Sequence, residues 1–124
     1  SDVKHKVSEV VTAAEIIAFQ QLVRRVPVTD HVIEYAVKLV HKTRPNGEMA
    51  ADETKQYLDW GAGPRASQAL ILAAKCNALL AGKYSPDIED VQAVALPILR
   101  HRIIRNFKAE SEGISEDQII KKLL

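Results

Sequence analysis

The residues with the clearest capacity for chemistry lie between Trp60 and Ser67, in the run Trp-Gly-Ala-Gly-Pro-Arg-Ala-Ser. Its two glycines allow a sharp turn or a close approach to another molecule, and Pro64 suits the first position of a helix. Arg65 then falls in the first helical turn, where the positive end of the helix dipole disfavours a cation by about 0.3–1 kcal/mol unless an anion is near. Free backbone N–H groups, the dipole and a guanidinium at one point suit a phosphate.

A structural role for Arg65 is also open. Its guanidinium could pair with a carboxylate such as Asp59, while Gly61 and Gly63 form a tight loop. A lone Gly-x-Gly is weak evidence for a ligand, so the residues alone do not choose between the two roles.

The sequence offers little other chemistry. Gly82-Lys83 is the only Gly-Lys pair, and it lacks both the preceding glycine and the following Ser or Thr of a P-loop. Residues 49–53 end in Asp-Glu but follow a polar stretch, so they do not suggest a magnesium-binding strand. The four histidines and Cys76 lack metal-ligand spacing, and no Ser, His and acid set is placed for nucleophilic catalysis. We expect no metal site, and no enzyme in this chain on its own.

Composition points to one globular domain, with 124 residues, a formal net charge of +1 and 47% apolar residues. Interleaved charges argue against a nucleic-acid surface, and no apolar run reaches the roughly 18 residues of a membrane span. The single Cys76 fits a small buried hydrophobe in a reducing compartment. We expect a soluble, cytoplasmic protein without nucleic-acid or membrane partners. The start at Ser1 suggests a piece cut from a longer chain.

Helical periodicity and capping signals predict an all-α fold, a compact bundle of four to five helices. Two capping boxes, at Thr12 and Ser115, start the first and last helices, and Thr29 caps a second helix that ends near Thr43. The expected inward residues are Ile16, Phe19, Val23 and Val26 in the first helix, Ile33, Ala36, Val37 and Val40 in the second, and Ile119, Ile120, Leu123 and Leu124 in the last.

The third helix is the most clearly defined, because Pro64 opens it, Gly82 ends it as a left-handed cap, and it is apolar on nearly every face. It must therefore be central. A fourth helix follows Asp87, and Pro97 should kink or restart it. Residues 44–58 read as an exposed loop with room for a short helical turn, and Val3–Val10 hints at a strand. The inward residues expected in the fourth helix are Val91, Val94, Ala95 and Ile98.

Four basic residues form a second cluster near the end of the fourth helix. Arg100, His101, Arg102 and Arg105 suit solvated charges and a favourable cation at a helix end, or alternatively an intersubunit or partner surface. The sparse aromatics, Trp60 and Tyr57 among them, suit packing better than a stacking platform for bases.

The run from Trp60 to Ala69 resembles the sensor 2 segment in the C-terminal lid of MoxR-type AAA+ ATPases, relatives of the magnesium-chelatase ATPase subunit. Residues 12–16 with 23–30, and residues 97–103, resemble the same lid in the same order. The resemblance covers nearly the whole chain, and the run through Arg65 is its most specific part. Its weakest part is the loop 45–53, to which no role is carried over.

The resemblance implies that residues 1–11 are an extended lead-in from an AAA+ core domain and residues 12–124 the helical lid. That core domain carries the P-loop and the magnesium-binding acids, so ATP and magnesium are held mainly there and neither is bound tightly by the lid. Arg65 matches the arginine that reaches the γ-phosphate. Ala62, Gly63 and Pro64 would lie near the nucleotide.

The partners implied by the resemblance are the AAA+ core domain of the same chain and neighbouring subunits of a ring oligomer. The parent protein would act as a chaperone that matures partner complexes, with an unidentified client. Two alternatives stay open: an independent helical protein-interaction module, and a helical DNA-binding domain that uses residues 100–105. The balanced charge makes the second the less favoured.

Overall fold

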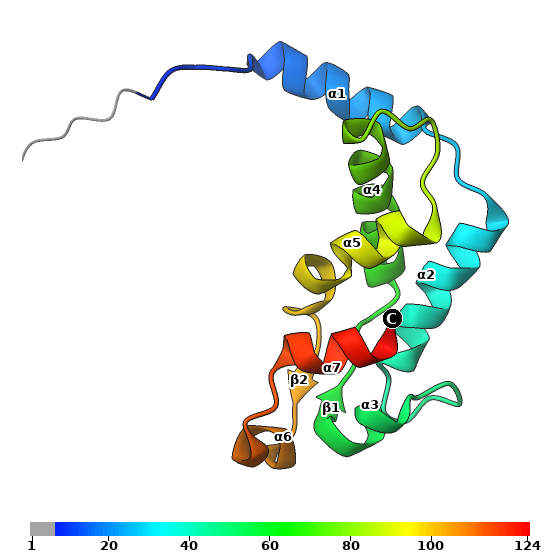
Figure 1. The fold of residues 1–124 in the computed structure, drawn as a ribbon, viewed down its shortest axis with the longest axis vertical. Coiled ribbons are helices and arrows are strands. Elements are labelled where there is room, and N and C mark those ends of the chain that lie inside the picture. The colour runs from blue at the N-terminus through cyan, green and yellow to red at the C-terminus, as the bar shows by residue number, and fades with distance from the viewer. Residues whose placement is uncertain (1–6) are drawn as a thin grey trace, which may run out of the picture.

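A computed structural model describes residues 7–124, and this part of the chain folds into seven helices and one two-stranded antiparallel sheet (Figure 1). Helix accounts for 63% of the structure, so the predicted all-α class is confirmed. There are more helices than the four to five expected, because two of them are only six residues long. In chain order the elements are α1 (Ala13–Arg25), α2 (Asp30–Lys42), α3 (Asp52–Tyr57), β1 (Leu58–Trp60), α4 (Arg65–Leu80), α5 (Ile88–Leu99), β2 (Ile104–Arg105), α6 (Phe107–Glu112) and α7 (Glu116–Leu123).

The predicted helix starts are present. In α1 and α7 the capping boxes are complete: Thr12 Oγ1 accepts from the backbone N–H of Glu15 at 3.1 Å, and Ser115 Oγ accepts from that of Gln118 at 3.1 Å. Thr29 is the N-cap of α2 but makes no side-chain cap hydrogen bond. These local interactions satisfy backbone donors that the helix itself leaves free, which is why short-range sequence signals located the ends.

The core is centred on α4, as predicted. This helix packs against α5, α2 and α1. Its buried face consists mainly of alanines around Leu70, and these small side chains let the neighbouring helices approach closely. Gly82 follows with a φ of +77°, the left-handed conformation expected of a C-terminal glycine.

The predicted core stripe of α1 is only partly buried. Val23 and the following Val26 are buried, whereas Ile16 is 49% exposed and Phe19 is half-buried. Figure 1 shows the reason: α1 lies across the C-terminal end of α4, and its N-terminal half projects beyond that end. The periodicity identified the apolar face correctly, but α4 is not wide enough to cover it.

The inward faces of α2 and α5 are rotated slightly from the predicted ones. Ile33 and Val37 of α2 are only half-buried, as are Val94 and Ile98 of α5, because each helix turns a neighbouring row of its surface toward the core. The helix α5 continues through Pro97, which is exposed, so no restart occurs there. Leu124 at the end of α7 is 37% exposed. The buried residues of α2 are Val32, Ala36, Leu39 and Val40, and those of α5 are Asp90, Val91, Ala95 and Leu99.

The segment expected to be an exposed loop is structured over much of its length. It holds α3 and the first residue of β1, and Thr54 within it is fully buried, with its hydroxyl donating to the Lys42 carbonyl at 2.5 Å. Strand β1 then pairs antiparallel with β2, with Trp60 opposite Ile104. Both contacts join residues far apart in the sequence, so a local reading of periodicity misses them.

The predicted strand at Val3–Val10 is wrong over residues 7–10, which have no regular secondary structure. Its remaining residues lie outside the described part of the chain, as do residues 1–6 of the predicted lead-in. The division into residues 1–11 and 12–124 stays a prediction.

Candidate functional site

The loop between β1 and α4 is held tightly against the end of α2. A side-chain carbon on Gly61 would lie 2.2 Å from the carbonyl oxygen of Thr43 and 2.7 Å from the Cα of Arg44. No real Cβ approaches backbone atoms that closely, so this position requires glycine. Gly61 therefore serves the internal packing of the chain.

Two side chains at the end of α2 fix the next residue of the loop. Thr43 Oγ1 accepts from the Ala62 backbone N–H at 2.9 Å and donates to the Val40 carbonyl at 2.6 Å. Arg44 Nε donates to the Ala62 carbonyl at 3.0 Å. Ala62 is itself 1% exposed, so both its backbone groups and its side chain are used within the chain. It positions the loop, and its methyl group is not accessible to a nucleotide.

Sequence reasoning missed the roles of Thr43 and Arg44. Both bond to a residue about 18 positions further along the chain, across a segment without clear periodicity. The residue type of Thr43 was the available signal. A threonine in the last turn of a helix can donate its hydroxyl to a carbonyl of the preceding turn and still accept one further hydrogen bond.

Arg65 begins α4 and is exposed, and within residues 7–124 its guanidinium makes no hydrogen bond or ion pair. The alternative pairing with Asp59 is therefore absent from the structure. The first turn of α4 contains no acidic residue. Nothing within this part of the chain offsets the unfavourable position of this cation at the positive end of a helix.

The backbone at the start of α4 is less open than expected. Pro64 is the N-cap, with helical φ and ψ of −59° and −31°. The N–H groups of Ala66 and Ser67 already donate to the carbonyls of Gly63 and Pro64, at 3.0 and 3.3 Å. The expectation of several free N–H groups is therefore wrong for these two, because a tight first turn uses them internally. The attraction for an anion rests on the Arg65 guanidinium and the helix dipole.

Gly63 differs from Gly61 in having open space around it. A Cβ built on Gly63 meets no atom within 4 Å, and its φ is not positive. The described part of the chain therefore gives no reason for glycine at this exposed position. A close approach by another molecule would supply one.

An open hollow lies beside this start of α4. Its volume is about 530 Å³, and residues 44–47 form one wall while residues 59–64 form the other. Trp60 is 68% exposed there, so the prediction that it serves packing is wrong. Tyr57 behaves differently: it is half-buried and its hydroxyl donates to Glu112 at 2.8 Å, a bond that raises the pKa of Tyr57 above its usual value.

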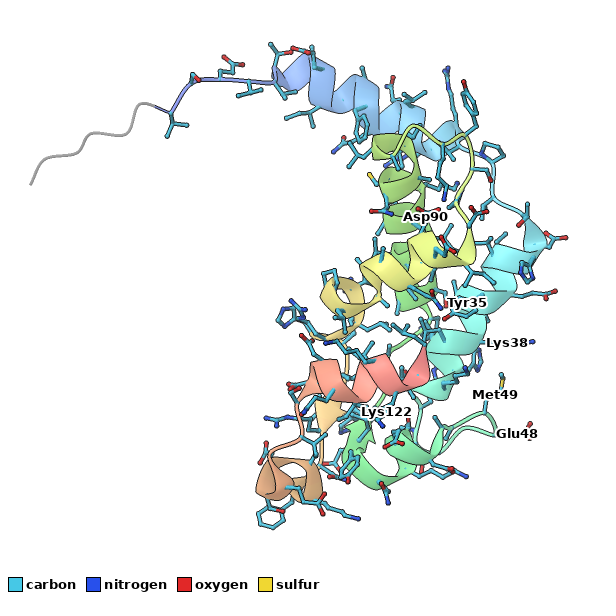
Figure 2. All side chains as sticks on the ribbon, in the orientation of Figure 1. Tyr35, Lys38, Glu48, Met49, Asp90 and Lys122 are labelled. Carbon is cyan, nitrogen blue, oxygen red and sulfur yellow. The ribbon has the colours of Figure 1, made fainter. Side chains whose placement is uncertain are left out.

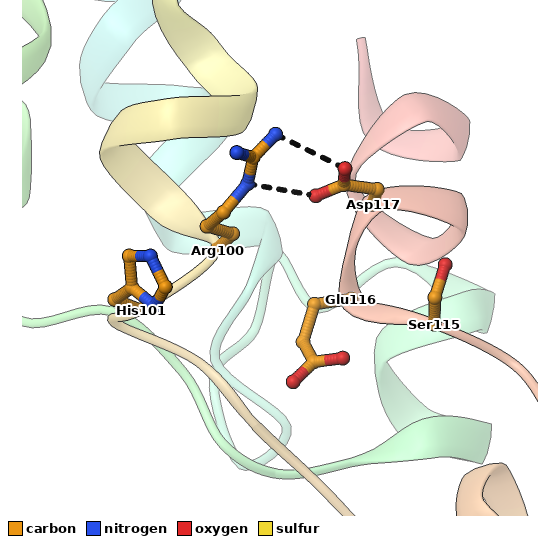
Figure 3. Close-up of a pocket in the computed structure, with 5 residues that line it drawn as sticks. All are labelled: Arg100, His101, Ser115, Glu116 and Asp117. Carbon is orange, nitrogen blue, oxygen red and sulfur yellow. Dashed lines mark hydrogen bonds and ion pairs between the residues drawn. The ribbon is translucent and has the colours of Figure 1, made fainter. Parts of the chain in front are cut away.

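The basic cluster at the end of α5 is largely paired within the fold. Arg100 donates from Nε and Nη2 to the two carboxylate oxygens of Asp117, at 3.1 and 3.0 Å, as Figure 3 shows. Arg105 pairs with Glu116 at 3.1 Å and donates to the Ile114 carbonyl at 2.8 Å. These contacts join α5 and β2 to the start of α7, so the two arginines have a structural role.

A second charged cluster joins α4 to α5 around Asp90, which is labelled in Figure 2. Asp90 is 4% exposed and accepts from Lys83 Nζ at 2.6 Å, from the Asp87 N–H at 2.7 Å and from Asn77 Nδ2 at 2.9 Å. Burial alone would raise the pKa of Asp90, but the three hydrogen bonds outweigh it and hold that pKa below its usual value. The hydrogen bond from Lys83 to Asp90 also raises the pKa of Lys83.

Two further kinds of feature are absent from the part of the chain that the structure describes. Within residues 7–124, no three or more His, Cys, Asp and Glu side chains gather where they could hold a metal ion. In the same residues, no helix combines the length and the apolar composition needed to cross a bilayer.

Known proteins match most of this chain. Residues 50–123 match the family model described as the AAA lid domain. The chain is similar to chaperone MoxR1 of Mycobacterium tuberculosis, with 28% identity over 94% of this chain and 31% of that protein. It is similar to uncharacterized protein YeaC of Bacillus subtilis, with 30% identity over 93% of this chain and 33% of that one.

A solved structure also shares the fold. The crystal structure of a proposed ATPase from Cytophaga hutchinsonii superposes with a TM-score of 0.81 and 33% identity, covering 89% of this chain and 33% of that one. This chain thus spans about a third of the length of the relatives it matches. The lid model covers more than half of it. The resemblance to a MoxR-type lid is confirmed, and the chain belongs to the AAA lid domain family.

Proposed function

We propose that this chain is the nucleotide-sensing lid of a MoxR-like ATPase, in which Arg65 is the sensor 2 arginine and contacts the γ-phosphate of ATP bound by a separate domain. One observation carries the proposal. Arg65 is exposed at the positive end of α4 and has no partner within residues 7–124, although a cation there is unfavourable without an anion nearby.

The chain positions Arg65 without supplying the rest of a nucleotide site. The α4 helix is the centre of the core, and Gly61 and Ala62 fix the preceding loop to α2. A guanidinium held on such a rigid element can stabilise the charge that develops on the phosphates during transfer. When the γ-phosphate leaves, Arg65 loses its partner, and the lid is free to change its position as a unit.

ATP and magnesium would be held mainly by the ATPase domain. Pro64 and Arg65 would face the nucleotide, and Gly63 would permit its close approach, whereas Ala62 would act only by positioning the loop. Magnesium, when bound, neutralises charge on the β- and γ-phosphates. The Arg65 guanidinium would add one further positive charge near the γ-phosphate.

The complete protein would couple ATP hydrolysis to a chaperone-like maturation of partner protein complexes. The relative from Mycobacterium tuberculosis is named a chaperone, which supports this part of the proposal. The ATPase domain of the same chain and neighbouring subunits of a ring are the proposed partners, in line with the lid family.

The test is ATP turnover by the full-length protein carrying Arg65→Ala. We expect turnover to fall by about 10²-fold or more, because removing one donor to a transition-state oxygen typically costs that much. Arg25→Ala is the matched control, since Arg25 is also exposed and lies in the last turn of a different helix, α1. Equal turnover in wild type and Arg65→Ala would overturn the sensor assignment.

A further inference from the structure

An apolar groove between α1 and α4 is left open in this chain. It has a volume of about 300 Å³ and is lined by Phe19, Gln20, Val23, Arg24, Leu72 and Cys76, and we call it the α1–α4 groove. Leu72 is 48% exposed, and Ile16, which continues the groove along α1, is 49% exposed. Apolar side chains grouped this way on a surface typically mark a contact with another macromolecule.

The groove arises because the apolar face of α1 is buried over only half of the helix. Ile16 and Val23 are seven residues apart, so they lie on the same side of α1. Val23 is 2% exposed, whereas Ile16 is 49% exposed and belongs to the N-terminal half of α1, which projects beyond the end of α4 (Figure 1). Of the helices and strands described, α4 is the main neighbour of α1. A helix with an apolar face and so few contacts gains stability from a second partner.

We infer that the α1–α4 groove is a docking surface for the ATPase domain of the same polypeptide, an inference that rests on the function proposed above. The comparisons support this occupant. The lid model begins at residue 50, after α1, yet the longer relatives align with 93–94% of the chain, which leaves too few residues unmatched to exclude α1. Thus α1 lies outside the matched lid but within the aligned part of proteins about three times as long.

The part of the longer relatives that this chain does not span is large enough for such a contact. The 116 aligned residues are 31% of the relative from Mycobacterium tuberculosis, so roughly 250 residues of such a protein lie beyond this chain, with a radius of gyration of about 18 Å and a diameter of about 45 Å. Leu72 and Cys76 of the groove follow Arg65 by 7 and 11 residues in α4, which places them about 11 and 17 Å further along the helix axis. One domain of that size could contact both Arg65 and the groove.

A second copy of this chain is a weaker candidate for the same surface. A stable dimer buries about 800 Å² on each partner, far more than a few half-exposed side chains provide. A domain tethered in the same polypeptide needs much less contact, because its effective concentration is in the millimolar range. The exposed Arg24 at the rim also favours a partner with a carboxylate at the matching point.

Hydrogen exchange tests the inference on the full-length protein. The amides of α1 should exchange at least about 10-fold more slowly in the full-length protein than in the 124-residue chain, because docking suppresses local opening. Ile16→Glu should abolish that protection, and so should Leu72→Glu on the other wall. Gln21→Glu, on an exposed position of α1 outside the groove, should leave it unchanged. Thermal melting of each variant 124-residue chain checks that the fold persists.

Three results would overturn the inference. The first is equal exchange of α1 in the two proteins. The second is protection in the 124-residue chain that rises with its concentration, which would identify a second copy. The third is protection that is lost when the full-length oligomer dissociates, which would identify a neighbouring subunit. Arg65→Ala separates this inference from the proposed function, because it should lower ATP turnover while leaving the protection of α1 intact.

Discussion

Arg65 lies at the N-terminal end of a helix and Arg100 at the C-terminal end of another. Arg100 is the C-cap of α5, where the dipole favours a cation, and it makes two hydrogen bonds to Asp117. Arg65 starts α4, where the dipole disfavours a cation, and it has no partner in the described part of the chain. The fold therefore accounts for Arg100 and gives the Arg65 side chain no partner within residues 7–124. The two glycines before Arg65 show the same contrast: contacts within the chain require glycine at position 61, whereas nothing within 4 Å requires it at position 63.

The largest difference is expected between those glycines. Gly61→Ala should lower the free energy of unfolding by about 2–4 kcal/mol, because its methyl group would overlap the backbone of Thr43 and Arg44. Gly63→Ala should be neutral or stabilise by about 0.4–1 kcal/mol, since it enters open space and restricts the unfolded chain. Urea denaturation of the two variants measures the difference in their free energies of unfolding. Similar destabilisation of both would contradict the conclusion that only Gly61 is required by packing within the chain.

The next largest effect concerns the buried Asp90. All its partners are donors, so Asp90→Asn would place an amide N–H₂ against them and should cost about 2–4 kcal/mol at pH 7. Glu89→Gln, at an exposed position in the same helical turn, is the matched control and should change little.

The same carboxylate predicts a pH dependence. Because the native pKa of Asp90 lies below its usual value of 3.8, its contribution is fully present above about pH 4 and is lost as the pH falls through the native pKa. Urea denaturation from pH 7 to pH 2 should therefore show a smaller difference between wild type and Asp90→Asn at the acidic end. A difference that stays constant over this range would show that the charge of Asp90 is not responsible.

The smallest effects, with opposite signs, are expected for the two arginines. Arg100→Ala should destabilise by about 0.2–1 kcal/mol, since both partners of the pair are about 40% exposed. Arg65→Ala should be neutral or stabilise the chain by about 0.3–1 kcal/mol, because it removes a cation from the start of α4. Thermal denaturation of the two variants compares them. A clear loss of stability in Arg65→Ala would point to an internal role.

Elements with local signals could be predicted from the sequence. The capping boxes at Thr12 and Ser115, the helix start at Pro64 and the end at Gly82 each act within a few residues, and the structure has helix ends at all of them. Arg65 also stood out locally, because a cation in a first turn conflicts with the dipole. Its role toward phosphate rests on the family resemblance and stays a proposal.

The parts that could not be predicted depend on contacts distant in sequence. The pairing of Trp60 with Ile104 joins strands separated by the whole of α4 and α5, and the bonds from Thr43 and Arg44 to Ala62 cross a segment without clear periodicity. For Ile16 the periodicity was correct, but its exposure depends on where α4 ends. Such outcomes are decided by tertiary packing, which a local pattern does not specify.

The most direct test of the central claim compares the affinities of the full-length protein for a non-hydrolysable ATP analogue and for ADP, in wild type and in Arg65→Ala. If Arg65 contacts the γ-phosphate, the variant should bind the ATP analogue about 10-fold or more weakly and ADP with nearly unchanged affinity, because ADP lacks that group. Equal losses for both nucleotides, or no loss for either, would contradict the assignment of Arg65.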